Sequence, residues 1–162
     1  MGRLLAVGGG TLAAVGASSY GTLAWAAGGS DSEKNWHFVK GWPKKAYDEK
    51  KTADAMKDFF GTSEATKSDK VSLTAPDIAE NGAVVPITIQ AKLPKVTRIA
   101  VFIPKNPYAM AVAYEIPQGT EPFVSNRVKM AKGSDVIAVV ESDGKLYKTS
   151  KHVKVTVGGC GG

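Results

Sequence analysis

From residue 71 onward, the chain is a series of short runs in which apolar and polar residues alternate. An alternation of this kind places successive side chains on opposite faces of an extended strand, and it leaves no stripe that a helix could bury. Val85, Ile87, Ile89 and Ala91, for example, share one face of a single run. The predicted strands are 71–74, 84–91, 98–103, 111–116, 123–130, 136–141 and 146–157, with a break in the last one near residue 150.

Turn residues separate these runs at regular intervals. They are Asn81-Gly82, Pro104–Pro107, Gln118-Gly119, Gly133-Ser134 and Asp143-Gly144. An Asp-Gly pair between two β-rich runs is a strong hairpin signal. Pro86 lies inside a run, and because proline cannot donate to a strand ladder, it predicts a sheet edge or a bulge at that point. About seven short strands with regular turns predict an all-β fold, an immunoglobulin-like antiparallel β-sandwich that spans residues 62–157.

A single amphipathic helix is predicted before the strands, within the N-terminal segment 27–61. Pro43 suits the first turn of a helix, and Gly61 suits the position just after its last residue. The apolar residues between them are spaced as one helical face, and they are Ala46, Tyr47, Ala53, Met56, Phe59 and Phe60. The spacing therefore predicts one amphipathic helix that precedes the sandwich.

Residues 1–26 have the features of a cleaved export signal. Arg3 is the only charged side chain before Asp31, and Ala24-Trp25-Ala26 matches the small-x-small pattern that signal peptidases cut. A membrane anchor is the alternative, because the apolar stretch of about 20 residues is long enough to cross a bilayer. We favour cleavage, since the many glycines and threonines make the stretch weakly apolar, and we expect an exported protein with no stable membrane anchor.

The basic excess of the chain, a formal net charge of +6, is a weak indicator of partners. The lysines are spread along the chain instead of forming a run, and an exported protein rarely meets nucleic acid. The charge therefore favours anionic small molecules or acidic protein partners over nucleic acid.

The only cysteine of the chain, Cys160, lies among glycines just after the last predicted strand. Val153, Val155 and Val157 alternate with polar residues, so we expect one buried face and a strand that ends firmly at Val157. Glycine loses more backbone entropy on ordering than any other residue. The segment 158–162, formed by Gly158, Gly159, Cys160, Gly161 and Gly162, is therefore predicted to be a flexible arm on a rigid base.

The residues around Cys160 point to a covalent attachment site more than to a catalytic one. Metal binding needs several ligands, yet the chain has one cysteine and two widely separated histidines, His37 and His152. A hydrolytic site would need a pocket and an oxyanion hole, which a glycine arm does not supply. We expect His152 to be a solvated strand residue and predict no cofactor, no metal and no catalytic residue. A lone thiol in an exported protein either carries a group or crosslinks two copies.

Several motifs together resemble the SoxY family, the sulfur-carrier subunits of SoxYZ complexes. They are Gly-Gly-Cys-Gly-Gly after Val153–Val157, the segment Leu73–Pro86, Lys105-Asn106-Pro107, Arg127–Met130 and Asp143–Tyr147. The resemblance implies an immunoglobulin-like subunit that pairs with SoxZ in the periplasm. It also implies that thiosulfate-derived intermediates are held covalently on Cys160. A twin-arginine signal, common in that family, is not visible here.

The same resemblance implies which enzymes act on the carrier. A SoxXA-like cytochrome couples thiosulfate to the thiol as a cysteine S-thiosulfonate, and a SoxB-like hydrolase releases sulfate to leave a persulfide. A sulfur dehydrogenase, where present, oxidises the remaining sulfur. One alternative stays open, an exported interaction module crosslinked through Cys160. A carrier that uses the terminal Gly161-Gly162 as a thiocarboxylate is disfavoured, because the export signal and the number of predicted strands both argue against it.

Overall fold

The computed structural model describes residue 41 and residues 43–157, all of which fall in one compact unit. Its helices are α1 (Lys44–Asp48), α2 (Thr52–Phe60) and the short 3₁₀ helix η2 (Gly82–Val84). Its strands are β1 (Thr66–Lys67), β2 (Val71–Thr74), β3 (Ile78–Asn81), β4 (Val85–Ala91), β5 (Val96–Phe102), β6 (Met110–Glu115), β7 (Phe123–Val128), β8 (Ser134–Ser142) and β9 (Lys145–Val157). No helix among these residues has the length and apolar character needed to cross a membrane.

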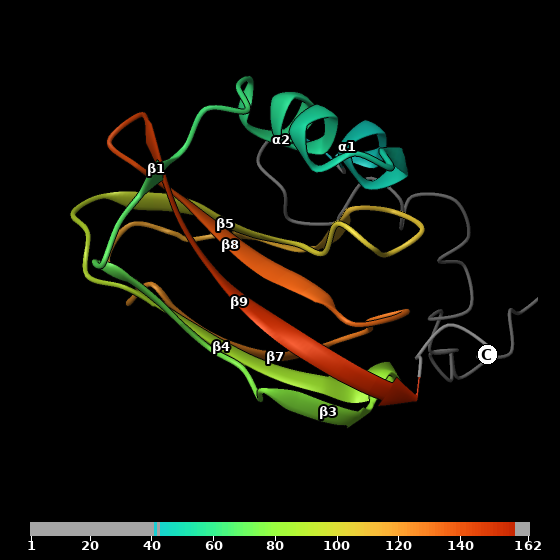
Figure 1. Cartoon of the computed structure of the whole chain (residues 1–162). Coiled ribbons are helices and arrows are strands. Elements are labelled where there is room, and N and C mark those ends of the chain that lie inside the picture. The colour runs from blue at the N-terminus through green and yellow to red at the C-terminus, as the bar shows by residue number, and fades with distance from the viewer. Residues whose placement is uncertain (1–40, 42, 158–162) are drawn as a thin grey trace, which may run out of the picture. The chain divides into compact units, whose positions relative to one another are not determined.

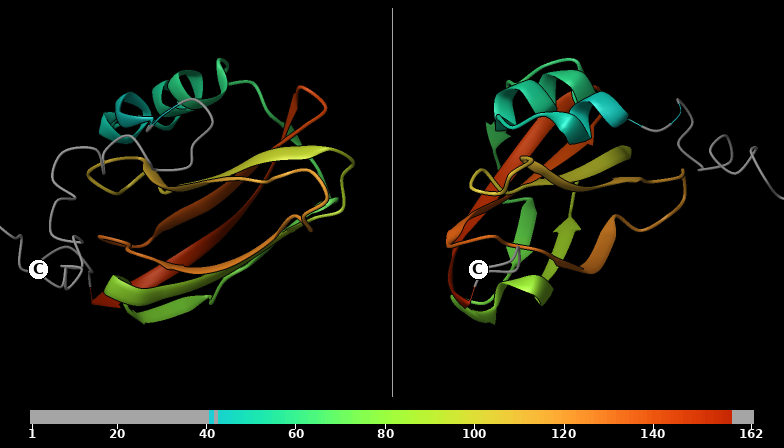
Figure 2. Two further views of the ribbon diagram at one scale, coloured as in Figure 1. Left: turned by 180° about the vertical axis from the view of Figure 1, so that it is seen from behind. Right: turned by 90° about the vertical axis from the view of Figure 1, so that its right-hand side faces the viewer.

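The strands form two sheets that pack face to face, with the helices as a third layer. The larger sheet has the order β1-β9-β8-β5-β6, with β3 also paired to β9, and the smaller has the order β2-β4-β7. Figure 1 shows α1 and α2 over the outer face of the larger sheet, at β5 and β8, and the smaller sheet on its other side. The two further views in Figure 2 show the same layers. The predicted immunoglobulin-like β-sandwich is confirmed.

The main core lies between the two sheets and follows the predicted alternation. In β4, Val85, Ile87, Ile89 and Ala91 are all buried, while the residues between them are exposed or half-buried. Pairings between long strands are antiparallel, and only the short β1 and β3 run parallel to β9 among the described strands. Burial of one face of each sheet therefore accounts for the period-two pattern of the sequence.

β5 departs from the simple alternation, because both of its faces are covered. Ile99 and Val101 face the second sheet as expected, but Ala100 and Phe102 are also fully buried. They pack with Met56 and other residues of the helices in a second core on the outer side of the sheet. Because of the helix layer, β5 is buried on both faces from Ile99 to Phe102, although its sequence predicts one exposed face.

The predicted single helix 43–60 is wrong in two respects, and the first is that the structure has two helices, separated by residues 49–51. Glu49 is extended, and its carbonyl oxygen accepts a hydrogen bond of 2.9 Å from the backbone N–H of Ala109. This bond to the β5–β6 loop replaces a helical one. The buried face also differs, because Ala55 is buried and Ala53 is exposed. Gly61 ends α2 as predicted, in the left-handed conformation with φ of 86°.

Two further predictions concern turns and edges. Asp143 and Gly144 have φ of 51° and 72°, which is the type I′ geometry of a two-residue hairpin, and they connect β8 to β9 as expected.

Pro86 lies where β4 pairs with β7 alone, because β2 ends opposite Thr88. The predicted edge is confirmed locally, although β4 is otherwise the middle strand of its sheet. The predicted break near Ser150 is wrong, since β9 is continuous and Ser150 pairs with Ile137.

Candidate functional site

The predicted site residues Gly158, Gly159, Cys160, Gly161 and Gly162 lie outside the described residues. The structure describes the chain up to Val157, the residue that precedes them. The described part of the site is its base, which consists of the end of β9 and the segments around it.

Backbone pairing with β3 holds the end of β9. The last pair between β8 and β9 is Ser134 with Val153, and beyond it β9 continues beside β3 in parallel register, up to the pair Asn81 and Val157. The N–H of Lys154 donates to the carbonyl of Asp77 at 2.9 Å, and the hydroxyl of Thr156 donates to the carbonyl of Glu80 at 2.9 Å. In Figure 1, β3 lies alongside the end of β9. The strand is therefore paired as far as Val157.

The valine face of β9 becomes exposed toward its end. Val153 is fully buried and Val155 is half-buried, but Val157 is 65% exposed. The prediction that all three valines are buried is wrong at Val157, because β8 has no residue paired beyond Val153 and so one flank of the strand is open there. Hydrogen bonds to β3, more than valine burial, fix the last residues of β9.

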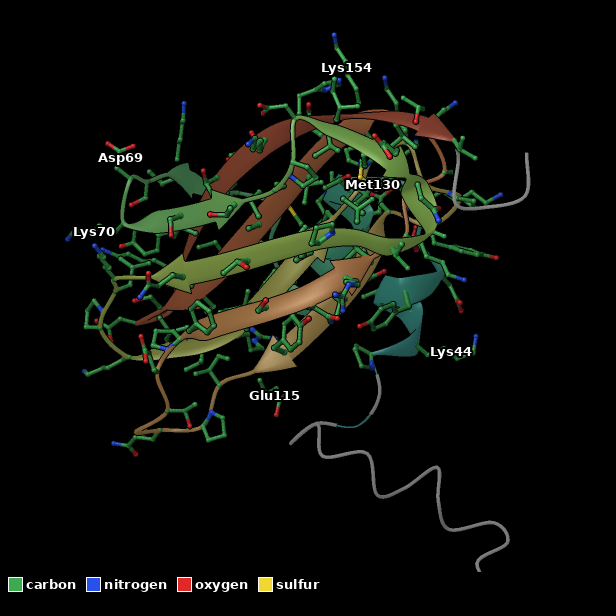
Figure 3. The ribbon with its side chains drawn as sticks, turned by 90° about the horizontal axis from the view of Figure 1, so that it is seen from below. Lys44, Asp69, Lys70, Glu115, Met130 and Lys154 are labelled. Atoms are coloured by element: carbon green, nitrogen blue, oxygen red, sulfur yellow. The ribbon has the colours of Figure 1, made fainter. Side chains whose placement is uncertain are left out.

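Two other segments surround the end of β9. The side chain of Asn81 caps η2 by accepting from the N–H of Ala83 at 2.8 Å, and the carbonyl of Gly82 accepts from the N–H of Met130 at 2.7 Å. Met130 is fully buried and is labelled in Figure 3, inside the ribbon. A Cβ at Gly133 would lie 3.5 to 3.6 Å from backbone atoms of residues 153–155, so the β7–β8 turn lies close against β9. The base is thus built from three stretches that are distant in sequence: β3 with η2, the β7–β8 turn and the end of β9.

Some charged side chains near the end of β9 have an ion-pair partner and others do not. His152 Nδ1 lies 2.7 Å from Asp135 Oδ1, and Lys151 Nζ lies 3.0 Å from Asp77 Oδ1. The imidazole of His152 is 54% exposed, which confirms the prediction of a solvated strand residue. Lys132 and Lys154, by contrast, are exposed and form no ion pair with another described residue.

A hollow of about 470 Å³ lies between the edge strands β6 and β7 of the two sheets. Its polar lining includes Asn106, Asn126, Arg127 and Lys129. Asn106 is already used structurally, because its amide donates to the carbonyl of Lys129 at 2.8 Å and accepts from the N–H of Ala131 at 2.9 Å. Within residues 43–157, no three His, Cys, Asp or Glu side chains come close enough together to hold a metal ion.

Sequence reasoning missed three exposed apolar residues near the base of the predicted arm: Ile78, Val84 and Val157. Ile78 belongs to β3, which was not predicted because four residues paired in parallel to a distant strand have no local alternation. Val84 was assigned to a strand, and Val157 to a buried face. Their shared location appears only when β3, η2 and β9 are brought together.

Comparisons with known proteins agree with one another. The family model described as sulfur oxidation protein SoxY matches residues 56–160, a range that ends on Cys160. The structure of the sulfur carrier protein SoxY from Chlorobium limicola f thiosulfatophilum is similar, with 38% sequence identity and a TM-score of 0.59, over 64% of this chain and 94% of that chain. Among curated protein sequences there is no match.

A more distant likeness concerns the fold alone. Superoxide reductase (neelaredoxin) from Ignicoccus hospitalis has a TM-score of 0.50 at 16% identity, over 56% of this chain and 94% of that chain. The family match, by contrast, covers more than half of the chain and reaches the cysteine. The chain therefore belongs to the SoxY family of sulfur oxidation proteins.

Proposed function

We propose that this protein is a periplasmic carrier that holds thiosulfate-derived sulfur covalently on Cys160. The observation that carries the proposal is the family match, which runs to the single cysteine of the chain. The position of that cysteine supports it, because Cys160 follows the hydrogen-bonded end of β9 by three residues. A thiol at such a place can be presented to several enzymes in turn while the sandwich stays folded.

The proposed chemistry begins with formation of a sulfur–sulfur bond. The thiolate of Cys160 and one thiosulfate lose two electrons together and give the S-thiosulfonate, Cys–S–S–SO₃⁻. A SoxXA-like cytochrome is the electron acceptor. The thiolate is the reacting form of cysteine, so this step requires loss of the thiol proton.

The second step is hydrolysis of the terminal sulfonate. A SoxB-like hydrolase adds water across the S–SO₃⁻ bond, so that sulfate leaves and Cys–S–SH, a persulfide, remains on the carrier. A sulfur dehydrogenase, where present, adds three oxygens from water to the outer sulfur and passes six electrons to its own electron acceptor, which gives Cys–S–SO₃⁻, a substrate for another hydrolysis. In this scheme the protein is a substrate-bearing subunit, paired with a SoxZ-like partner, and the enzymes supply the catalysis.

Intact mass of the protein from periplasm tests the proposal. After growth on thiosulfate, we expect masses that correspond to sulfur or thiosulfonate additions, and we expect a reductant to remove them, because both are bound through sulfur–sulfur bonds. A single unmodified mass under these conditions would contradict the carrier function.

The variant Cys160→Ser is the matched control. It should fold, pair with the SoxZ-like subunit and carry no added mass, and thiosulfate oxidation should stop. If wild-type protein is instead a reducible homodimer without a sulfur adduct, Cys160 is a crosslink and the chain is an interaction module.

A further inference from the structure

Basic side chains without acidic neighbours in sequence lie at the end of the sandwich where β9 stops. Two turns are found at this end, the β5–β6 loop (residues 103–109) and the β7–β8 turn (residues 129–133). The chain segments that contain them, residues 99–114 and 122–134, include no Asp and no Glu. Their basic residues are all exposed and form what we call the basic surface: Lys105, Arg127, Lys129 and Lys132.

Hydrogen bonds hold the loop and the turn against each other. The amide of Asn106 donates to the carbonyl of Lys129 at 2.8 Å and accepts from the N–H of Ala131 at 2.9 Å. The N–H of Lys105 donates to the hydroxyl of Ser134 at 3.3 Å. The four basic residues therefore belong to segments that are in direct contact, although they come from two distant parts of the sequence.

The same turn also lies against the base of the predicted arm. A Cβ at Gly133 would lie 3.5 to 3.6 Å from backbone atoms of residues 153–155. The N–H of Met130 donates to the carbonyl of Gly82 in η2 at 2.7 Å, and the residue that caps η2 is paired with Val157. Cys160 follows Val157 by three residues, which span at most about 10–11 Å. The basic surface and the thiol thus belong to the same end of the molecule.

No residue of the basic surface forms an ion pair with another described residue. Carboxylates on the surrounding elements are each accompanied by basic residues. They are Asp77, which contacts Lys151 at 3.0 Å, Asp135, which contacts His152 at 2.7 Å, Glu80, which lies in the strand that pairs with Lys154, and Glu49, which Lys50 and Lys51 follow. The basic surface therefore leaves an excess of positive charge at this end.

An excess of positive charge matters for the reaction proposed above, because both reactants are anions. The thiolate of Cys160 carries one negative charge and thiosulfate carries two, so the two repel each other in water. Fixed cations near the thiol raise the local concentration of anions, most of all where a hollow is lined by charges of one sign. Arg127 and Lys129 line the hollow between β6 and β7.

We propose that Lys105, Arg127, Lys129 and Lys132 attract divalent sulfur oxyanions to Cys160 and so select them over neutral sulfur compounds. The proposal rests on the carrier function proposed above and assigns its choice of substrate to this surface. Attraction of this kind needs no contact of fixed geometry, since the field of a charge extends over about 10 Å at 0.1 M salt and about 30 Å at 0.01 M.

The test compares an anionic and a neutral reagent on the same thiol. The thiolate of Cys160 attacks an inner sulfur of tetrathionate, a dianion, which gives Cys–S–S–SO₃⁻ and releases thiosulfate. It attacks 2,2′-dithiodipyridine, which is neutral, to give a mixed disulfide and release pyridine-2-thiolate. Both reactions start from the thiolate, so the ratio of their rate constants does not depend on the thiol pKa. Intact mass of this chain, in the heterodimer with the SoxZ-like subunit, follows both.

The test variant combines Lys105→Gln, Arg127→Gln, Lys129→Gln and Lys132→Gln. At about 10 mM salt, the ratio of the tetrathionate rate to the dithiodipyridine rate should fall about fivefold, as expected for the loss of four cations about 15–20 Å from the thiol. At about 150 mM salt the fall should be about twofold or less, because screening is stronger. Cystamine, a dication, should react faster with the variant than with wild type.

A matched control removes the same number of charges at the other end of the sandwich. Lys145 begins β9, and Lys70 and Lys92 adjoin the pair Val71 and Ala91, at the far end of β4 from η2. The control variant consists of Lys67→Gln, Lys70→Gln, Lys92→Gln and Lys145→Gln, all at exposed positions without an ion pair to another described residue. Its ratio should stay within about 1.5-fold of wild type.

Each other outcome has a defined meaning. A wild-type ratio in the test variant, or an equal fall in the control variant, overturns the selection by this surface and leaves the carrier function intact. Loss of the SoxZ-like subunit from the test variant, seen by size-exclusion chromatography, shows that the surface is the subunit interface and also overturns the proposal. Absence of any adduct on Cys160 after growth on thiosulfate overturns the proposed function itself, whatever the ratio.

Discussion

At the scale of single residues, Arg98 joins the helix layer to the larger sheet. Its Nε and Nη2 donate to the carboxylate of Glu141 at 2.7 Å each, and its Nη1 donates to the carbonyl of Phe59, the second-last residue of α2, at 2.6 Å. The guanidinium also lies 5.0 Å from the ring centroid of Phe59. The hydrogen bonds to Glu141 raise the pKa of Arg98 above its ordinary value. One side chain thus satisfies a carboxylate and a helix end together.

Arg98→Ala should lower the free energy of unfolding by about 2–3 kcal/mol, because it leaves the largely buried Glu141 without its bidentate partner. Urea denaturation measures the difference. Lys95→Ala is the control, since Lys95 and Asp143 form a pair at 3.5 Å whose side chains are 78% and 70% exposed. The control should change stability by less than about 0.5 kcal/mol. Equal effects of the two variants would show that Arg98 does not anchor α2.

At the scale of elements, β9 is the strand that leads from the larger sheet to the predicted arm. It pairs with β8 over Lys145–Val153, with β1 near its start and with β3 near its end. The strand therefore passes from a core position, flanked on both sides, to an end that is held by β3. The exposed fraction of the valine side chains increases toward the same end, from Val153, which is fully buried, to Val157, which is exposed.

This gradient predicts unequal effects of the same substitution at two positions. Val153→Ala should lower the free energy of unfolding by about 1.5–2.5 kcal/mol, because it removes buried methyl groups and leaves a cavity. Val157→Ala should change it by less than about 0.5 kcal/mol, since that side chain is already exposed. Chemical denaturation of both variants checks the prediction. A large loss at Val157 would mean that its side chain is packed in the free protein.

At the scale of the whole molecule, two tyrosines tie layers and sheets together. Tyr47 of α1 packs on the outer core and is hydrogen-bonded to the backbone of Ala113 in β6. The hydroxyl of Tyr114 in β6 accepts from the amide of Asn126 in β7 at 2.5 Å, across the two sheets. Burial raises the pKa of both phenols above the ordinary value of 10.0, and the hydrogen bonds from Ala113 and Asn126 oppose that shift.

A raised phenol pKa makes stability depend on pH on the alkaline side. Below pH 10 both phenols are neutral in the folded and unfolded states, so their contribution is fully present. As the pH rises above 10 the unfolded chain ionises first, which favours unfolding until the folded-state pKa is reached. The double variant Tyr47→Phe with Tyr114→Phe should therefore lose stability less steeply above pH 10 than wild type, as thermal denaturation across pH measures. Identical slopes would contradict this account.

The sequence by itself determined the β-sandwich and the main core. Alternation in β4 predicted its buried face correctly, Gly61 and Asp143-Gly144 predicted a helix end and a hairpin, and several motifs in combination indicated the SoxY family. The strand face, the helix end and the hairpin are local features, because alternation and a positive φ are each visible within a few residues.

Only the tertiary structure decided which faces are covered from outside and what surrounds the base of the predicted arm. The burial of Phe102 on the second face of β5, the break after α1 at Glu49 and the exposure of Val157 all depend on segments far away in sequence. β3 came to lie beside the end of β9 through a parallel pairing, from Ile78 opposite Lys154 to Asn81 opposite Val157, and this pairing has no local signal. The physical reason is that alternation of apolar and polar residues along a strand indicates only that one of its faces is buried. Contacts of the other face, and pairing with a strand distant in sequence, are made only when the chain folds.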